Sequence, residues 1–199
     1  YNGLLLFHGL GTGKTCSAIS VCEEQRDYMI QMNINNPIII VANKKVQESF
    51  KLQLFDESKL VRIKGNWTIP GCVGNKFIKE INPMNSSVFK NLDVEKSKKI
   101  LVKQIKKIIN KYYVFMGYTE FANKIGKLVD KYKLYDNEND SEKDRNIKIK
   151  AIEKEFSDRM IVIDEVHNIR IIYDEDNKNM KKTFNNFLNL VNYTQNMKL

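Results

Sequence analysis

The chain has 199 residues, of which 42% are hydrophobic and 29% charged, a composition and length that suit one globular domain with a substantial core. Its longest apolar runs, PIIIVA and MIVI, are far too short to cross a bilayer, so no membrane partner is expected. No signal peptide is visible, although the first residues already lie within a strand-like run. The net charge of +9 favours polyanionic partners such as nucleic acid.

The first half of the chain alternates between strand and helix patterns. The sequence predicts a buried strand over Gly3–Phe7, a loop over His8–Gly13, and a helix that starts near Lys14 and ends before residue 33. A second buried strand is expected over Ile38–Ala42, and the apolar spacing of residues 43–55 predicts another helix. This order of strand, helix, strand and helix implies parallel pairing through right-handed crossovers.

The second half continues these patterns between two irregular stretches. Residues 65–75 are predicted to form a loop, with Trp67 as a packing anchor rather than a base-stacking residue, and residues 134–150 an exposed insertion. We expect one α/β domain with three layers and a largely parallel sheet. The remaining elements are predicted as strands at Leu60–Ile63, Tyr112–Met116 and Met160–Ile163, and helices at Val94–Lys111, Thr119–Tyr132 and Met180–Thr194.

The three cysteines, Cys16, Cys22 and Cys72, are odd in number and have no CxxC spacing. This pattern argues against a disulfide framework or a zinc site and favours a reducing compartment. Cys16 lies just past the glycine-rich loop, where a small residue that packs a helix start is favoured over a redox-active thiol.

The loop between the first strand and the first helix reads His-Gly-Leu-Gly-Thr-Gly-Lys-Thr. A strand, a glycine-rich turn and a helix that starts at Lys-Thr form the phosphate-binding arrangement of P-loop NTPases. Glycines let successive amides point into one concavity, and the helix start adds partial positive charge. Lys14 is therefore expected to reach the β- and γ-phosphates and Thr15 to bind Mg²⁺. The expected nucleotide-binding residues are His8, Gly9, Leu10, Gly11, Thr12, Gly13, Lys14 and Thr15.

One position of this loop departs from the usual motif, which has glycine where this chain has His8. We interpret the departure as a mark of subfamily, because the core from Gly11 to Thr15 is intact.

A second motif, RMIVIDEVHNIR, is an apolar strand that ends in two acids. Ligands of parallel sheets gather at the carboxyl ends of the strands, so Asp164 is expected beside the phosphate loop, where it would hold Mg²⁺. Glu165 is then placed to polarise the attacking water. His167 either caps the turn after the strand or couples the nucleotide state to a nucleic-acid site. The predicted catalytic residues are Lys14, Asp164, Glu165 and His167.

Together, FHGLGTGKT and VIDEVHNIR resemble the motifs of superfamily 2 helicases of the DEAH/DExH type. The likeness is greatest to the nucleoside triphosphate phosphohydrolase I and early transcription factor helicases of poxviruses and other large DNA viruses. PIIIVANKKVQESFKLQLF looks like motif Ia of that family, and YYVFMGYTEFANKI like its next strand and turn, with Gly117-Tyr118-Thr119-Glu120 in a different order.

The resemblance implies that residues 1–199 form the ATP-binding, first RecA-like lobe of a longer protein, with the Ser-Ala-Thr motif and the second lobe beyond them. It implies an ATP hydrolase that uses Mg²⁺ to translocate on or remodel DNA or RNA, slow when this lobe is alone. Expected partners are the second lobe and viral RNA polymerase or transcription factors, in the virion or the viral factory of the host cytoplasm. Val46 replaces the acid of a guanine signature in NKKV, which disfavours a GTPase.

The best candidates for nucleic-acid contact are Asn43, Lys44 and Lys45, because they follow a strand at the ligand-bearing edge of the sheet. The Lys-rich helix Val94–Lys111 is interpreted as a solvated outer face more readily than as a phosphate-binding surface. Two other functions stay open. One is a P-loop ATPase of another kind, such as an oligomeric AAA-type machine. The other is a structural nucleic-acid-binding subunit of a viral transcription complex.

Overall fold

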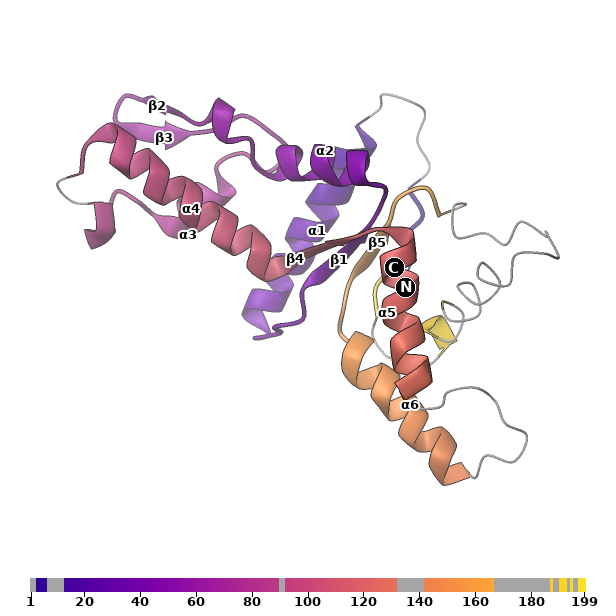
Figure 1. Ribbon diagram of the computed structural model, residues 1–199. Coiled ribbons are helices and arrows are strands. Elements are labelled where there is room, and N and C mark those ends of the chain that lie inside the picture. The colour runs from indigo at the N-terminus through magenta and orange to yellow at the C-terminus, as the bar shows by residue number, and fades with distance from the viewer. Residues whose placement is uncertain are drawn as a thin grey trace. The chain divides into compact units, whose positions relative to one another are not determined.

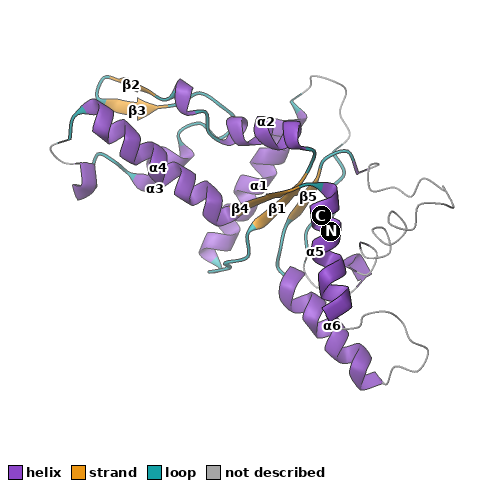
Figure 2. Cartoon of the chain, viewed as in Figure 1, coloured by secondary structure: helices purple, strands orange, loops and turns teal. Residues whose placement is uncertain are grey.

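The chain folds as mixed α and β structure in two compact units, seen here in a computed structural model (Figures 1 and 2). The sheet unit comprises Tyr1–Leu5, Ile38–Lys44 and Phe115–Leu199, and the helical unit comprises Leu6–Pro37 and Lys45–Val114. The structure describes residues 3–6, 13–89, 92–131, 142–166, 187, 190–192, 194 and 197–199.

A three-stranded sheet in the order β4-β1-β5 organises the sheet unit. It is built from β1 (Ile38–Val41), β4 (Tyr113–Met116), which starts at the end of the helical unit, and β5 (Ile161–Ile163). β1 and β5 are parallel, with Ile39 opposite Ile161. All four residues of β1 are buried, as expected for a β-branched run in a parallel strand that is covered on both faces. The predicted strands Ile38–Ala42, Tyr112–Met116 and Met160–Ile163 are confirmed to within one residue.

The other edge of β5 is extended by the segment 197–199. Met160 forms a parallel bridge with Lys198, and the Ile161 amide donates to the Lys198 carbonyl at 2.8 Å. The Leu4 amide in turn donates to the Leu199 carbonyl at 2.8 Å. The segment that leads into the glycine-rich loop therefore lies one step away from β5.

The prediction of a buried strand over Gly3–Phe7 is wrong for its described part. Residues 3–6 are not in a regular strand, and Leu4 and Leu5 are 60% and 78% exposed. A buried parallel strand requires pairing along the segment and cover on both faces, whereas the recorded pairing here is one hydrogen bond to Leu199. Phe7 lies outside the described residues.

Two helices complete the described part of the sheet unit. In α5 (Tyr118–Lys131) Phe121 and Ile125 are buried, and in α6 (Glu142–Phe156) Ile152 and Phe156 are buried. Lys124 of α5 pairs with Glu155 of α6 at 3.0 Å. The helix predicted over Thr119–Tyr132 is confirmed through Lys131. Most of the helix predicted over Met180–Thr194 lies outside the described residues.

The predicted insertion 134–150 divides into two parts. Residues 142–150 form the first turns of α6, which were not expected to be helical, while residues 132–141 lie outside the described part of the chain. Among the α6 residues whose burial is described, Ile152 and Phe156 are buried; they are four positions apart and follow the charged stretch. The charged composition of residues 142–150 therefore gave no sign of a helix whose described buried residues lie near its C-terminal end.

The helical unit is built around α1 (Lys14–Gln31) and α4 (Val94–Tyr112), with α3 (Lys76–Ile81) packed on α4. α2 (Lys44–Leu54) buries Phe50 and Leu54, the spacing that predicted it. Short 3₁₀ helices cover Glu57–Lys59 and Ser87–Phe89. Within the described residues, no helix is both long and apolar enough to cross a membrane. The core includes Ile19, Met29, Leu60, Phe77, Leu101 and Ile105.

A small hairpin occupies the region where a strand and a loop were predicted. β2 (Val61–Ile63) pairs with β3 (Asn66–Thr68) in an antiparallel sheet of their own. Lys64 and Gly65 join them with φ values of 48° and 82°, the two positive angles of a tight hairpin turn. The prediction of an irregular loop is therefore wrong for residues 66–68. Trp67 is 9% exposed, and Arg62 lies over its ring at 5.9 Å, so its role as a packing anchor is confirmed.

Candidate functional site

The helix start of the phosphate-loop motif has the predicted local structure. α1 begins at Lys14, and Gly13 caps it with φ 82° and ψ 21°, a left-handed conformation that glycine adopts without strain. Lys14 and Thr15 are therefore the first two residues of the helix. The preceding residues of the predicted loop, His8, Gly9, Leu10, Gly11 and Thr12, lie outside the described part of the chain.

The first turn of α1 has the electrostatics of an anion-binding helix start. It contains no acidic residue, and no side chain caps it. Helix starts ordinarily favour carboxylates and capping side chains, because their amides lack partners and carry partial positive charge. A lysine at this end is unfavourable unless an external anion supplies the missing negative charge. This turn is therefore suited to a bound phosphate.

A disulfide joins Cys16, the third residue of α1, to Cys72, with 5.2 Å between their Cα atoms. The sequence argued against any disulfide, and this prediction is wrong: the pattern alone did not reveal that a loop 56 positions later returns to the start of α1. The Gln53 Oε1 atom lies 3.4 Å from the Cys16 Sγ and 3.0 Å from the Cys72 Sγ, where it can accept from either thiol when they are reduced. A disulfide does not fit the predicted reducing compartment.

The third cysteine, Cys22, is a buried free thiol. Burial, and secondarily the nearby Glu23 carboxylate, raise its pKa to about 12. It therefore stays protonated at neutral pH and acts as a small core residue.

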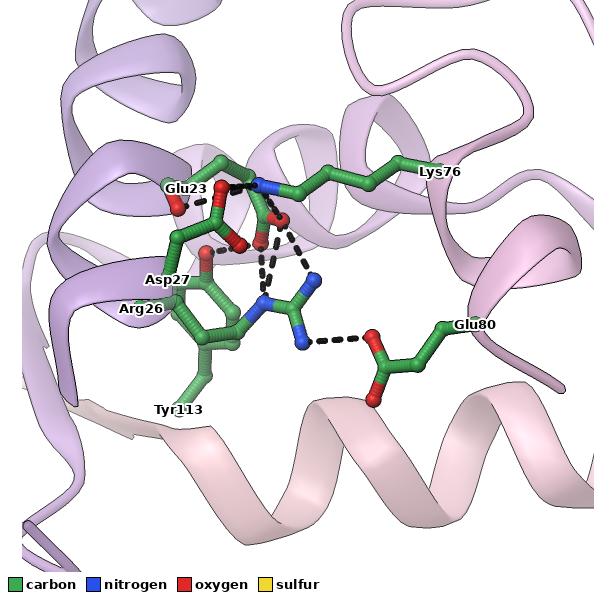
Figure 3. Close-up of polar contacts among 6 residues, drawn as sticks. All are labelled: Glu23, Arg26, Asp27, Lys76, Glu80 and Tyr113. Carbon is green, nitrogen blue, oxygen red and sulfur yellow. Dashed lines mark hydrogen bonds and ion pairs between the residues drawn. The ribbon is translucent and has the colours of Figure 1, made fainter. Parts of the chain in front are cut away.

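A buried network of charged side chains anchors α1 within the helical unit (Figure 3). The Arg26 side chain is fully buried and forms ion pairs of 2.8 Å with both Glu23 and Glu80. Its guanidinium lies 5.1 Å from the ring centre of Phe77 and 5.5 Å from that of Tyr112. Burial lowers the pKa of Arg26, but hydrogen bonds and charge from Glu23 and Glu80 outweigh it and raise the pKa overall.

Two further groups satisfy the acids of this network. Lys76 of α3 contacts Glu23 at 3.1 Å and Asp27 at 2.7 Å, and the Tyr113 hydroxyl donates to the Glu23 carboxylate (Figure 3). Burial and the Glu23 charge raise the pKa of Tyr113, so its phenol remains a donor. Sequence reasoning missed this network. The available signal was that Glu23 and Arg26, three positions apart, share the inner face of α1.

The two predicted acids follow β5 directly in the sheet unit. The Asp164 amide donates to the Val41 carbonyl at 2.9 Å, which continues the ladder between β5 and β1 by one residue. The Ala42 amide donates to the Met116 carbonyl at 3.1 Å and joins the end of β1 to the end of β4. Asp164 and Glu165 therefore emerge where the carboxyl ends of the strands meet, the edge at which parallel sheets bind ligands.

The turn after β5 has unusual backbone geometry at Glu165. Its φ of 49° lies in the left-handed region, which non-glycine residues seldom adopt and which is enriched at functional sites. The Tyr118 hydroxyl donates to the Asp164 carbonyl at 2.7 Å and holds this turn from the first residue of α5. The sequence drew attention to Gly117-Tyr118-Thr119-Glu120 but did not predict this contact.

The predicted nucleic-acid residues Asn43, Lys44 and Lys45 follow β1 and are exposed. Asn43 and Lys44 belong to the sheet unit and Lys45 to the helical unit. His167 lies outside the described residues. No group of three or more His, Cys, Asp and Glu side chains in the described part of the chain is arranged to hold a metal. The Thr15 hydroxyl and the Asp164 carboxylate are hard oxygen donors, the type that Mg²⁺ prefers.

Comparison with known proteins gives one distant relationship. No protein-family model matches the chain, and no solved structure matches it. It is 25% identical over 178 residues to a protein of Acanthamoeba polyphaga mimivirus whose name marks it as a candidate ATP-dependent RNA helicase, L377. The match covers 85% of this chain and 14% of that protein, so the chain spans a small part of its relative's length. The sequence match and the mixed α/β fold with its parallel strands together support a helicase-like relationship.

Proposed function

We propose that the chain is the ATP-binding, first RecA-like lobe of a superfamily 2 motor that hydrolyses ATP on nucleic acid. The observation that carries the proposal is the local geometry of its two motifs. A left-handed glycine precedes a helix that starts at Lys14-Thr15, and Asp164-Glu165 follow a strand parallel to β1 at the carboxyl edge of the sheet. The likeness to the mimivirus protein points the same way.

The sheet unit adds a second line of support. Leu4, which precedes the phosphate loop, donates its amide to the Leu199 carbonyl, and the 197–199 segment lies along β5. The chain therefore enters the loop from the unit that carries the acids. In P-loop NTPases the loop and the acidic strand end serve one nucleotide, and a three-layer arrangement around this sheet is part of the proposal.

Each motif residue has a distinct role in this proposal. The amides from His8 to Gly13 surround the phosphates, Lys14 neutralises the β- and γ-phosphate oxygens, and Thr15 and Asp164 hold Mg²⁺. Mg²⁺ supplies charge stabilisation when bound. Glu165 orients and polarises the attacking water, so that its proton can move to the carboxylate as the oxygen attacks the γ-phosphorus. The bond from the γ-phosphorus to the bridging oxygen breaks in the same displacement, and that oxygen leaves with ADP. His167 couples this site to the nucleic acid.

Tyr118 supports this chemistry as a positioning residue. By holding the Asp164 carbonyl, its hydroxyl restrains the turn in which Asp164 and Glu165 leave the strand. The left-handed φ of Glu165 lies in the same turn, so the direction of both carboxylates depends on this restraint. A small misplacement of such groups lowers the rate strongly, because catalysis of phosphoryl transfer is largely positioning.

The wider context is proposed from the resemblance to the poxvirus-type phosphohydrolase and early transcription factor helicases. Residues 1–199 would act with a second RecA-like lobe, would contact DNA or RNA through Asn43, Lys44 and Lys45, and would work with viral transcription proteins. The virion or a viral factory is the corresponding location, and of the two the virion fits the Cys16–Cys72 disulfide better than the reducing cytoplasm does. The lobe by itself would turn over ATP slowly, since part of the catalytic charge would come from its partner.

Substitution of Glu165→Gln tests the function. A motor lobe with this variant should bind a fluorescent ATP analogue as the native chain does but hydrolyse ATP at least about a hundredfold more slowly, because the group that polarises water is lost. Glu48→Gln on α2 is the matched control, since it makes the same change at an exposed position. Unchanged hydrolysis in Glu165→Gln would contradict the proposal.

A further inference from the structure

The outer face of α4 carries a dense set of positive charges. Exposed lysines occupy positions 96, 99, 103, 106, 107 and 111 of this helix. The buried residues of α4 are Ser97, Leu101, Ile105 and Ile109, which form one inner stripe. At about 100° per residue, the six lysines fall within roughly 140° of arc centred opposite that stripe. We call these six residues the lysine face.

The lysine face contains like charges at the spacing where helical side chains meet. Lys99, Lys103, Lys107 and Lys111 follow one another at intervals of four, and like charges at this spacing destabilise a helix by a few tenths of a kcal/mol per pair. An ordinary solvated helix face mixes acids with bases. Here the only acid within α4 is Glu95, in its first turn. An external polyanion would relieve the repulsion among these lysines.

Neighbouring acids neutralise only part of the lysine face. Lys96 pairs with Asp93 at 3.1 Å, and Lys106 pairs with Glu57 at 2.6 Å. Among the described residues, no ion pair is recorded for Lys103 or Lys107, in the second half of the helix. These two lysines are therefore the strongest candidates for contact with an external anion.

The distribution of charge over the chain points to the same surface. Almost all of the net charge of +9 lies in the helical unit, whereas acids and bases nearly balance in the sheet unit. From Lys96 to Lys111 the face is about 22 Å long at 1.5 Å per residue. A nucleic-acid backbone is a linear polyanion that presents several phosphates over such a length.

We propose that the lysine face of α4 binds the phosphate backbone of DNA or RNA, as a contact surface separate from Asn43, Lys44 and Lys45. The inference rests on the proposed nucleic-acid function. It adds the surface of the helical unit that contacts the nucleic-acid backbone. Because lysines contact phosphates as point charges, this surface would bind without sequence preference and would weaken as salt rises.

The test is the double variant Lys103→Glu/Lys107→Glu. It places a glutamate four residues after Lys99 and another four residues before Lys111, so the helix gains favourable pairs and a loss of binding does not come from unfolding. The matched control is Lys150→Glu/Lys154→Glu on α6. It has the same change in net charge and the same spacing, also at exposed positions.

Binding would be measured by fluorescence anisotropy with labelled single-stranded DNA and RNA over a salt series. We expect Lys103→Glu/Lys107→Glu to weaken binding at low salt by at least about tenfold and to reduce the slope of log K against log salt by about 1.5. The α6 control should change affinity less than about twofold, and both variants should bind the ATP analogue normally.

The outcomes separate this inference from the proposed function. Suppose that the native chain binds nucleic acid and that both double variants weaken this binding equally, or that neither does. The inference about the lysine face is then overturned, and the motor proposal stands. If the native chain binds neither DNA nor RNA at low salt, nucleic-acid binding by this chain is itself overturned. Loss of binding to anionic phosphatidylserine vesicles with oligonucleotide binding intact would overturn the inference in favour of a lipid surface.

Discussion

The two units of this chain are stabilised by different kinds of interaction. The sheet unit is built on β-branched strands such as β1, with its polar motif residues at the strand ends. The helical unit has an ion network around the buried side chains of Arg26 and Glu23 and is crosslinked by Cys16–Cys72. This difference indicates that the positions of Asp164 and Glu165 depend on backbone hydrogen bonds between strands. The position of the helix that carries Lys14 and Thr15 depends instead on specific side-chain contacts.

Arg26→Met should produce the largest change, and it should be confined to the helical unit. It removes the cation that pairs with the buried Glu23 carboxylate, and loss of one partner of a buried pair costs about 3–5 kcal/mol. We expect the lower end of this range, because Lys76 and Tyr113 still contact Glu23 and because Glu80 is 37% exposed. The fluorescence of Trp67, the only tryptophan and a buried residue of this unit, reports its unfolding in urea. Lys59→Met, at an exposed pair with Asp56, is the control and should shift the free energy of unfolding by less than about 0.5 kcal/mol. If Arg26→Met lowers the free energy of unfolding by less than about 1 kcal/mol, the helical unit does not depend on this ion network and the contrast with the sheet unit is lost.

Reduction of the disulfide should give the next largest change. Opening a loop of this length costs roughly 2–4 kcal/mol of stability, so a reducing agent should lower the melting temperature followed by Trp67 fluorescence. The double variant Cys16→Ser/Cys72→Ser should melt at the lower temperature with or without the reducing agent. Equal melting of the native chain in both conditions would show that the crosslink does not stabilise this unit.

Thiol labelling sharpens the same comparison. Before reduction, we expect no alkylation of the folded chain by iodoacetamide, because the raised pKa and burial of Cys22 protect its thiol. After mild reduction, mass spectrometry should find labels on Cys16 and Cys72 alone. Rapid labelling of Cys22 in the folded chain would contradict its assignment as a core residue.

Tyr118→Phe should have a smaller effect, seen in activity rather than in folding. The variant loses one hydrogen bond to the Asp164 carbonyl, and a loss of about 1 kcal/mol in positioning corresponds to roughly a fivefold lower kcat for ATP hydrolysis. KM should change less than kcat, since the phosphate loop and Lys14 would still bind the nucleotide. Tyr112→Phe is the control in the helical unit, because it keeps the ring that faces Arg26. Equal kcat values in the two variants would argue against a positioning role.

The smallest expected effect concerns the start of α4, where Asp93 accepts a hydrogen bond from the Lys96 amide at 2.7 Å. That bond lowers the pKa of Asp93 below its ordinary value of 3.8. Because the pKa of Asp93 is lower in the folded chain than in the unfolded chain, the cap stabilises the helix fully at pH values above the unfolded pKa. This stabilisation is lost as the pH falls through the folded pKa of Asp93. The Lys96 amide shift in NMR should therefore titrate with a midpoint below 3.8, and Asp93→Asn should abolish that titration. A midpoint at or above 3.8 in the native chain would be inconsistent with the cap.

The parts of the fold that depend on local periodicity could be predicted from the sequence, and those that depend on distant residues could not. Uninterrupted apolar runs identified β1 and β5, and four-residue spacing identified α2 and α4. The start of α1 at Lys14 followed from the glycine-rich motif. By contrast, the Cys16–Cys72 pair and the Arg26–Glu80 contact join positions more than fifty residues apart, and no local pattern signals them.

The candidate site shows the same division. Asp164 and Glu165 were predicted at a strand end because acids that end an apolar run must leave the sheet there. The Tyr118 contact could not be predicted, because it requires knowing that β4 lies beside β1 and brings its following helix to that edge. The strand at Gly3–Phe7 failed because an apolar run does not reveal whether neighbouring strands cover it.

The central proposal is that Thr15 and Asp164 bind one Mg²⁺ ion together with ATP. A double-mutant cycle on Mg²⁺-dependent ATP affinity, measured with Thr15→Ala, Asp164→Asn and the combination, tests it most directly. If the two side chains share the ion, the double variant should bind little more weakly than the weaker single variant, with at least about 1 kcal/mol of non-additivity. Additive losses, or no loss in either single variant, would contradict the account.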